Sequence, residues 1–301
     1  MKNILEYLPP AVPSASFLLE DGILSGVRTE KKKASFRFVS KISETAFEVS
    51  SEEWPQREEM APAVERALLS LGNPDRAAFL LPDVVFRMQV LELENFPKSE
   101  EEKEKILLWQ ARRNLGHPVQ DLRIRQHLLE KDGDFTRLWA AAAPRELLAG
   151  IEKLFSDRGC HLGFISSPVM VLHPLLEKKG IMKSDGLELL LNMTSKSITF
   201  LFTRDGLPVF FRTKELRSGD ETADRFAQEI RLTLAFQREK LGNEGLKRVC
   251  HRVAGDDMFF PAEDFDEGTE VVSLNDISPD TETDGIRGYS LLPLLASLEE
   301  E

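Results

Sequence analysis

One short pattern occurs twice in this chain: an apolar run, then Asp-Gly, then a second apolar run with an Arg near its end. The first copy is ASFLLEDGILSGVR (15–28) and the second is SITFLFTRDGLPVFFR (197–212). Asp-Gly between two apolar runs predicts a β-hairpin, because the tight turn needs residues that accept a left-handed backbone. Solenoid repeats have periods of about 20 to 50 residues, and Gly22 and Gly206 stand much farther apart. The recurrence therefore predicts a two-lobed protein built from duplicated halves.

A similar series of elements is expected after each hairpin. The first is followed by patterns for a strand at 34–42, a short helix at 61–71 and a buried strand at 76–82. The second is followed by patterns for a long amphipathic helix at 221–241, a strand at 246–255 and a final helix at 285–298. Continuous apolar runs such as RAAFLLP are typical of strands buried on both faces of a parallel sheet. The chain is therefore expected to belong to the α/β class.

Residues 85–143 interrupt this order and are expected to form an inserted α+β subdomain. Ser99 and Glu102 form a capping box that starts a helix, which reaches Asn114. Strands are predicted at 84–93, 122–130 and 135–143. A further helix is predicted to start at Ser167-Pro168, and Pro174 is expected to disturb it. The predicted organisation is a first lobe of residues 1–84 and 144–183, an inserted subdomain of residues 85–143, and a second lobe of residues 184–301.

Composition excludes several classes of protein. The 301 residues carry a formal net charge of -12, whereas a general nucleic-acid binder is usually basic. Cys160 and Cys250 are far apart, which is neither a disulfide framework nor a metal-ligand spacing. Glu6, Pro9 and Pro10 interrupt what a signal peptide needs as a continuous apolar core, and no run approaches the roughly 18 apolar residues of a membrane span. We expect a cytoplasmic protein that reaches a membrane only through a partner.

The predicted order resembles the actin-like (ribonuclease H-like) ATPase fold. More narrowly, the chain resembles the family of the type IV pilus assembly protein PilM and the cytoplasmic domain of the type II secretion protein GspL. The resemblance covers roughly residues 15–298 and rests on four stretches in the family's order. These are AAFLLPDVVFRMQVLELENFP (77–97), ILLWQARRNLGHPVQDLRIRQHLL (106–129), LELLLNMTSKSITFLFTRDGLPVFFRT (187–213) and ADRFAQEIRLTLAFQREKLGNEGLKRV (223–249). The resemblance implies two actin-like lobes with a subdomain inserted in the first.

The resemblance also implies where a nucleotide would bind, and this chain departs from that pattern. ATP-binding members hold the phosphates with one hairpin turn from each lobe, using carboxylates to place Mg²⁺ and glycines to let backbone N–H groups approach. In lobe one the turn is Asp21-Gly22, without the hydroxyl residues and the Lys of the family. In lobe two the family's Asp-Ile-Gly-Ala-Thr-Thr is replaced by residues 192–197 (NMTSKS), which lack the family's carboxylate and glycine. The positions that could still meet an anion are Asn192, Thr194, Ser195 and Lys196, with Gly255 alone at the adenosine strand.

The function that the resemblance implies is that of an adaptor on the cytoplasmic side of an inner membrane. PilM binds the cytosolic tail of PilN, a membrane protein with one span, in a groove beside the inserted subdomain, and GspL-type proteins bind the secretion ATPase in a related place. A PilN-like tail is therefore the expected partner, with a pilus or secretion ATPase as a further candidate. The expected groove lining is Phe86, Met88, Val90, Trp109, Arg112, Arg113 and Trp139. Core packing is the alternative for each, and Trp109 with Arg113 is the favoured exposed pair.

Two other functional classes stay open. An actin-like ATPase that still binds Mg-ATP would use Asp21 in lobe one and Asp256 or Asp257 near the adenosine strand. A filament-forming protein leaves no simple motif. The five His show no metal-ligand spacing such as His-Glu-x-x-His, and the chain has neither a Walker loop nor Gly-x-Ser-x-Gly. No catalytic residue, resident metal or obligatory cofactor is therefore predicted, with nucleotide binding expected to be lost.

Overall fold

The computed structural model describes ten stretches of the chain, and all structural statements below concern these residues. They are 13–30, 33–39, 54–97, 99–115, 121–183, 185–216, 223–242, 244–254, 260–276 and 288–298.

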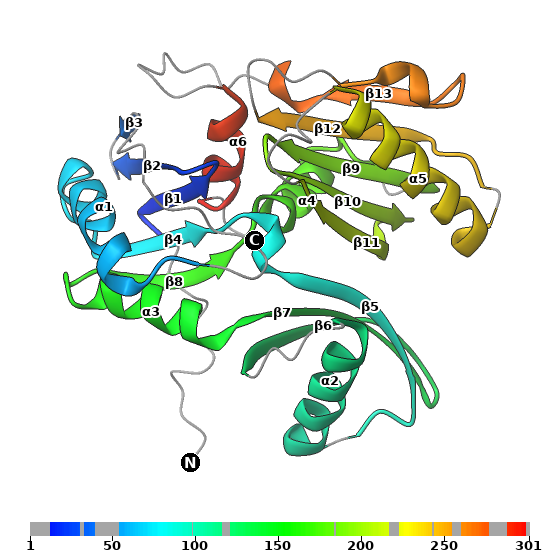
Figure 1. Ribbon diagram of the computed structural model, residues 1–301, viewed down its shortest axis with the longest axis horizontal. Coiled ribbons are helices and arrows are strands. Elements are labelled where there is room, and N and C mark those ends of the chain that lie inside the picture. Colours follow the sequence, from blue (N-terminus) through cyan, green and yellow to red (C-terminus); the bar gives the residue numbers. More distant parts are fainter. Residues whose placement is uncertain are drawn as a thin grey trace.

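Lobe one is built on a five-stranded mixed sheet in the order β3-β2-β1-β4-β8 (Figure 1). Its strands are β1 (Ala15–Glu20), β2 (Ile23–Glu30), β3 (Lys33–Val39), β4 (Arg76–Leu80) and β8 (His161–Ser166). The first three strands form an antiparallel meander, and β4 and β8 add to it in parallel. The helices α1 (Arg57–Ser70) and α3 (Arg145–Ser156) belong to this lobe.

Lobe two repeats the same sheet in the order β11-β10-β9-β12-β13 (Figure 1). Its elements are β9 (Leu187–Thr194), β10 (Ser197–Arg204), β11 (Leu207–Glu215), α5 (Ala223–Leu241), β12 (Arg248–Ala254) and β13 (Glu270–Ser273). The short 3₁₀ turns η3 (Ala262–Asp264) and η4 (Leu274–Asp276) flank β13. Three antiparallel strands are again followed by two parallel ones, so the predicted duplication is present in the strand order.

The two Asp-Gly hairpins do not occupy equivalent places in the two lobes. Asp21-Gly22 joins β1 to β2, whereas Asp205-Gly206 joins β10 to β11, one turn later in the series. The counterpart of the first turn is the β9–β10 turn at Ser195 and Lys196. Asp-Gly recurs because each of these turns has φ near +50° at Asp and +70° to +80° at Gly, which favours this pair in a two-residue hairpin. The repeated Asp-Gly therefore reflects the geometry of a tight turn and does not mark equivalent positions in the two lobes.

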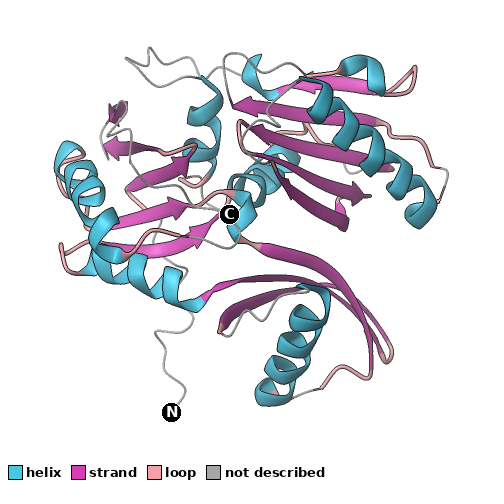
Figure 2. Ribbon diagram, in the orientation of Figure 1, coloured by secondary structure: helices cyan, strands magenta, loops and turns pink. Residues whose placement is uncertain are grey.

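A third, three-stranded sheet projects from lobe one in the order β5-β7-β6. Its elements are β5 (Arg87–Glu94), α2 (Glu100–Leu115), β6 (Leu122–Asp132) and β7 (Phe135–Pro144), and the 3₁₀ turn η2 (Asp83–Val85) leads into it. The predicted strand at 84–93 thus begins later, because residues 83–85 form η2. Figure 2 shows α2 on one side of this long, curved sheet. Strand β7 runs directly into α3 and so returns the chain to lobe one.

Two helices lie between the lobes and join them. Helix α4 (Pro168–Lys178) contacts β9 of lobe two, and α6 (Gly288–Ala296) contacts β1, β2, α4 and β12. Pro174 was expected to disturb α4, but the helix continues through it to Lys178. The missing N–H removes one backbone hydrogen bond, and burial of Leu172, Leu175 and Leu176 holds the helix in place.

One apolar cluster extends through lobe one and into lobe two. At its centre Phe155 meets Phe17 and Phe79 edge to face, with ring centroids 5.5 Å and 5.4 Å apart, an arrangement that aromatic rings prefer. The same cluster includes Leu190 and Leu201 of the lobe-two sheet. The inner faces of both sheets therefore contribute to one continuous core.

Candidate functional site

The β1–β2 and β9–β10 turns, where the resemblance would place phosphate loops, touch each other across the two lobes. The backbone N–H of Ser195, in the β9–β10 turn, donates to Oδ2 of Asp21 in the β1–β2 turn over 3.1 Å. The fold therefore brings two predicted segments, 174 residues apart, into direct contact. The contact is between protein groups, with one lobe's carboxylate accepting the other lobe's amide.

The β9–β10 turn also uses its remaining amide groups internally. The Thr194 side-chain oxygen accepts the N–H of Lys196 over 3.2 Å and the N–H of Ser197 over 3.1 Å. Together with the Ser195 amide, three consecutive N–H groups have protein acceptors. A phosphate loop needs such amides free to point at the anion, so this turn would have to give up three hydrogen bonds to hold one.

A buried arginine lies behind the two turns. Arg252, on β12, is fully buried, and its guanidinium donates to both carboxylate oxygens of Glu20, over 2.9 Å and 2.5 Å. The same Nη1 donates to Oδ1 of Asn192 over 2.7 Å. Glu20 is the last residue of β1 in lobe one, and Arg252 and Asn192 are paired neighbours on β12 and β9 in lobe two. This two-oxygen ion pair therefore crosses from one lobe to the other.

The hydrogen bonds continue from Asn192 back into lobe one. Its side-chain amide donates to Oδ2 of Asp83 over 2.7 Å, and Oδ1 of Asp83 accepts the backbone N–H of Val169 over 3.2 Å. Val169 lies in the first turn of α4, where a helix favours a nearby negative charge. We call Glu20, Asp21, Asp83, Asn192, Ser195 and Arg252 the interlobe network.

Burial shifts the ionisation of the acidic groups in this network. Desolvation, followed by repulsion from Glu20, raises the pKa of Asp21 to about 6, against the opposing hydrogen bonds from Ser195. Burial likewise raises the pKa of Asp83. Burial works to lower the pKa of Arg252, but attraction to Glu20 and their hydrogen bonds give a net rise. The network therefore favours one cation, Arg252, and disfavours further negative charge.

A pH dependence follows for the Asp21→Asn variant. A carboxyl with a raised pKa holds its proton more tightly in the folded protein, so stability falls as pH rises from the ordinary value of 3.8 towards 6. Above pH 6 the ionised Asp21 costs up to about 3 kcal/mol. Asn keeps a hydrogen-bond acceptor and suits the left-handed turn, where φ is 48°. The variant and the wild type should melt at similar temperatures near pH 4, and the variant should melt higher by pH 7. A difference that does not change with pH would contradict this.

These residues do not fit a magnesium nucleotide in the way the resemblance implies. Asn192 stands where the family has a carboxylate, and its amide is already bonded to Asp83 and Arg252. The guanidinium that could meet a phosphate is neutralised by Glu20. Of the predicted nucleotide-site residues, Asp21 and Ser195 are in direct contact. Thr194 and Lys196 lie at the same β9–β10 turn as Ser195, and Asn192 lies two residues before Thr194 on β9. Gly255, Asp256 and Asp257 lie outside the described residues.

Three members of the interlobe network were not selected from the sequence. Arg252 offered a local signal, since it lies in a strand, RVCHRVA, in which every residue is buried, and a buried arginine needs a partner. Its partner Glu20 lies 232 residues away, at the end of another buried strand. Asp83 comes directly after Pro82, where the short connection that follows the buried strand β4 ends. Pairing them requires the three-dimensional contact of the lobes.

A concave surface lies on lobe one, where α3 begins after the inserted sheet. This groove has a volume of about 450 Å³. It is lined by Trp54, Pro55, Gln56, Arg57, Met60, Glu146, Leu147, Ala149, Gly150 and Lys153. Met60 and Leu147 are buried and provide an apolar floor, while charged side chains stand at the rim. We call it the α1–α3 groove.

Charged contacts tie this groove to the inserted subdomain. Arg123 of β6 forms a two-point ion pair with Glu152 of α3. Arg145, the first residue of α3, pairs with Asp121 over 2.8 Å, just before β6. The helix that lines the groove is therefore held against the edge strand of the inserted sheet.

Most of the residues predicted to line a partner groove lie elsewhere. Phe86, Met88 and Trp139 are buried, and the Trp139 ring meets Phe211 of lobe two edge to face, with ring centroids 5.9 Å apart. These three side chains follow the core-packing alternative. Trp109 is 56% exposed on α2. Val90 packs against the core cluster, and the side chains of Arg112 and Arg113 lie outside the described residues.

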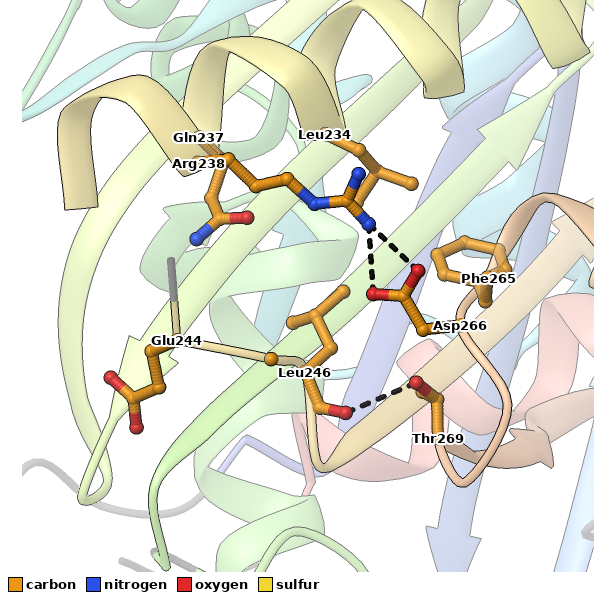
Figure 3. A pocket seen from close by; sticks show the side chains of 9 residues that line it. Leu234, Gln237, Arg238, Glu244, Leu246, Phe265, Asp266 and Thr269 are labelled. Carbon is orange, nitrogen blue, oxygen red and sulfur yellow. Dashed lines mark hydrogen bonds and ion pairs between the residues drawn. The ribbon is translucent and has the colours of Figure 1, made fainter. Parts of the chain in front are cut away.

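Another cavity, in lobe two, is too small for a ligand (Figure 3). It lies between the end of α5 and the loop before β13, where Arg238 donates to both oxygens of Asp266. Its volume of about 10 Å³ is close to the minimum for one water. The buried Gln237 Nε2 beside it has no hydrogen-bond partner among the described residues, and such a water would supply one.

Two negative findings concern the residues that the structure describes. Within these stretches no cluster of three or more His, Cys, Asp or Glu could hold a metal ion. No helix in them is long and apolar enough to cross a membrane.

Comparison with known proteins gives structural likeness without sequence matches. No family model and no curated protein matches the chain. A chain of a solved structure described as the PilM-PilN type IV pilus biogenesis complex superimposes with a TM-score of 0.74 at 15% identity, covering 96% of this chain and 99% of that one. The cytoplasmic domain of EpsL, an inner-membrane component of the Vibrio cholerae type II secretion system, gives 0.54 at 10% identity, covering 95% of each chain.

A third solved structure carries the name of the fold. It is a Bacteroides thetaiotaomicron protein described as having an actin-like ATPase fold and unknown function, with a TM-score of 0.53 at 10% identity, covering 92% of this chain and 95% of that one. At such identities these likenesses concern the fold alone. The chain therefore has the actin-like ATPase fold, which it shares over nearly its whole length with chains from a pilus-biogenesis complex and a type II secretion component.

Proposed function

We propose that this chain is a cytoplasmic adaptor of a type IV pilus or type II secretion platform. In this proposal it binds the cytosolic tail of a PilN-like membrane protein in the α1–α3 groove, and it does so without a bound nucleotide. The observation that carries the proposal is the groove itself, which lies on lobe one where the chain returns from the inserted subdomain into α3. Its volume of about 450 Å³ falls within the range of ligand sites.

The chemistry of the groove suits a short extended peptide. Trp54 lies just before α1, Met60 lies in α1, and Leu147 and Gly150 lie in α3, so apolar residues from both helices line the groove. An apolar side chain of a peptide would gain about 25 cal/mol for each Å² of surface removed from water there. Glu146 is exposed at the rim and would attract the basic residues that flank membrane spans on their cytoplasmic side. The rim also carries the cations Arg57 and Lys153, which are both paired with Asp157.

The structural likenesses support the cellular setting of the proposal. The pilus structure is described as a PilM-PilN complex, and EpsL is described as an inner-membrane component of a secretion system. No described helix is long and apolar enough to cross a membrane, so attachment through a partner's tail would place the protein at the inner membrane. A pilus or secretion ATPase remains a second candidate partner.

Loss of nucleotide binding is supported by the occupied donors of the interlobe network. The Ser195, Lys196 and Ser197 amides have protein acceptors, and Arg252 is paired with Glu20. The carboxylate that the family uses in lobe two is replaced by Asn192. Binding Mg-ATP would require breaking these contacts before making new ones.

The proposal is tested with two ligands in one melting experiment. The first is a synthetic peptide of the cytosolic tail of a single-span membrane protein encoded beside this chain's gene, and the second is Mg-ATP. The adaptor proposal expects the peptide to raise the melting temperature and Mg-ATP to leave it unchanged, because only a ligand of the folded state stabilises it. A shift with Mg-ATP and none with the peptide would favour an actin-like ATPase instead.

Gly150 allows the groove to be blocked without damaging the fold. A Cβ at this position would meet nothing within 4 Å, and Gly within a helix is less favourable than Ala by about 1 kcal/mol. Gly150→Phe should therefore fold at least as stably as the wild type while filling the groove. We expect it to weaken peptide binding at least tenfold, or about 1.4 kcal/mol, in a calorimetric titration.

The matched control is Gly150→Ala, which also removes the helix-interior Gly but adds only one methyl group. It should melt slightly higher than the wild type and bind the peptide with nearly unchanged affinity. Equal binding by the Phe and Ala variants would place the peptide outside the α1–α3 groove.

A further inference from the structure

The interlobe network joins the two lobes at the point where the fold would otherwise hold phosphates. Glu20 and Asp83 belong to lobe one, and Asn192 and Arg252 belong to lobe two. Each of the four is at most 7% exposed. The chain of contacts runs from Glu20 through Arg252 and Asn192 to Asp83, so it crosses between the lobes twice.

We infer that the interlobe network closes the two lobes on each other from within, so that side chains of this protein set the lobe arrangement in place of a bound nucleotide. The guanidinium of Arg252 supplies the positive charge between the lobes, and Glu20 supplies its counter-charge over 2.9 Å and 2.5 Å. A paired, doubly bonded guanidinium and carboxylate fix distance as well as orientation. The side chain of Asn192 is neutral, which suits its place beside Arg252, because Glu20 already balances the positive charge of Arg252.

The turn contact adds to the same closure. The amide of Ser195 reaches Asp21 over 3.1 Å, which ties the β9–β10 turn of lobe two to the β1–β2 turn of lobe one. Because both turns are two-residue hairpins with left-handed residues in the first, neither has slack to accommodate a wide separation. Lobes that move apart would break this bond together with those of Arg252.

The closure also determines where the inserted subdomain sits, which connects this inference to the proposed function. The inserted sheet is fixed to lobe one through Arg123 and Glu152 and meets lobe two through Trp139 and Phe211. If the lobes stay closed, both attachments hold at once. The α1–α3 groove is lined by residues of lobe one alone, so a closed arrangement leaves it competent to bind without any nucleotide cycle. Lobe closure is inferred from the interlobe network alone and does not depend on any partner.

Amide hydrogen exchange of residues 192–197 tests the inference. Arg252→Met removes the bridging cation while keeping a long side chain, and we expect at least tenfold faster exchange of these amides. Arg248→Met is the matched control, because Arg248 lies on the same strand and forms an equally buried pair with Glu188, but within lobe two. It should alter exchange near the start of β12 and leave residues 192–197 within about twofold of the wild type.

A milder variant keeps the test decisive if Arg252→Met fails to fold. Glu20→Gln retains an acceptor for the guanidinium but removes the counter-charge, and it should speed exchange of residues 192–197 about threefold. Millimolar Mg-ATP should leave exchange of these residues unchanged in the wild type. Unchanged exchange in both network variants, an equal effect of Arg248→Met, or slower exchange with Mg-ATP would each overturn the inference. None of these results depends on whether the tail peptide binds.

Discussion

Replacing Arg252 by Met should lower the free energy of unfolding by about 3 to 5 kcal/mol, the range for breaking a buried ion pair by removing one partner. Arg252 is fully buried and Glu20 is only 7% exposed, so the variant leaves a carboxylate without its cation and away from water. The variant also removes the guanidinium N–H that donates a hydrogen bond to the side-chain Oδ1 of Asn192. Urea unfolding with comparison of transition midpoints and slopes provides the measurement.

The double variant Glu20→Leu with Arg252→Met is the control for this prediction. Replacing a whole buried ion pair with apolar side chains of similar volume is often neutral, so the double variant should recover most of the stability lost by the single one. A double-mutant cycle gives their coupling energy directly. Strictly additive losses from the two single changes would show that the pair does not act as a unit.

Trp139→Ala should also destabilise the protein strongly, by about 3 to 5 kcal/mol, as expected for truncating a large buried aromatic residue. The Trp139 side chain is 5% exposed and packs edge to face on Phe211, so the truncation opens a cavity between the inserted sheet and lobe two. Its ring N–H has no hydrogen-bond partner among the described residues, so Trp139→Phe should cost much less. Thermal or urea unfolding of the two variants checks both expectations.

This prediction also separates packing from partner contact for Trp139. A packing residue loses stability on truncation, and its Phe variant should still bind the tail peptide with wild-type affinity. If Trp139→Ala kept full stability and lost peptide binding, the side chain would instead be part of the partner surface. The exposed Trp109, substituted by Ala, gives the reference for a surface aromatic residue.

The architecture could be predicted from the sequence because its signals are local. Apolar periodicity, Asp-Gly turns and the capping residues at Ser99 and Glu102 each depend on neighbouring positions. The strands at 122–130 and 135–143 correspond closely to β6 and β7. Pro174 failed as a predictor because the packing of α4 outweighs one missing hydrogen bond.

The site was predicted less well because it depends on contacts between distant segments. The two turns could be selected from family positions, but the direct bond from Ser195 to Asp21 depends on how the lobes meet. The partner of Arg252 could not be predicted from its own strand, because Glu20 lies 232 residues away in the other lobe. The buried positions of Phe86, Met88 and Trp139 likewise follow from the way the inserted sheet lies between the lobes, which a pattern of alternating apolar residues does not specify.

The central claim is that the protein binds a partner's tail in the α1–α3 groove without nucleotide. Calorimetric titration of the wild type and of Gly150→Phe with the tail peptide, each with and without millimolar Mg-ATP, tests it most directly. We expect the wild type to bind with the same dissociation constant in both conditions, and Gly150→Phe to bind at least tenfold more weakly in both. Binding that requires Mg-ATP, or that survives Gly150→Phe unchanged, would contradict it.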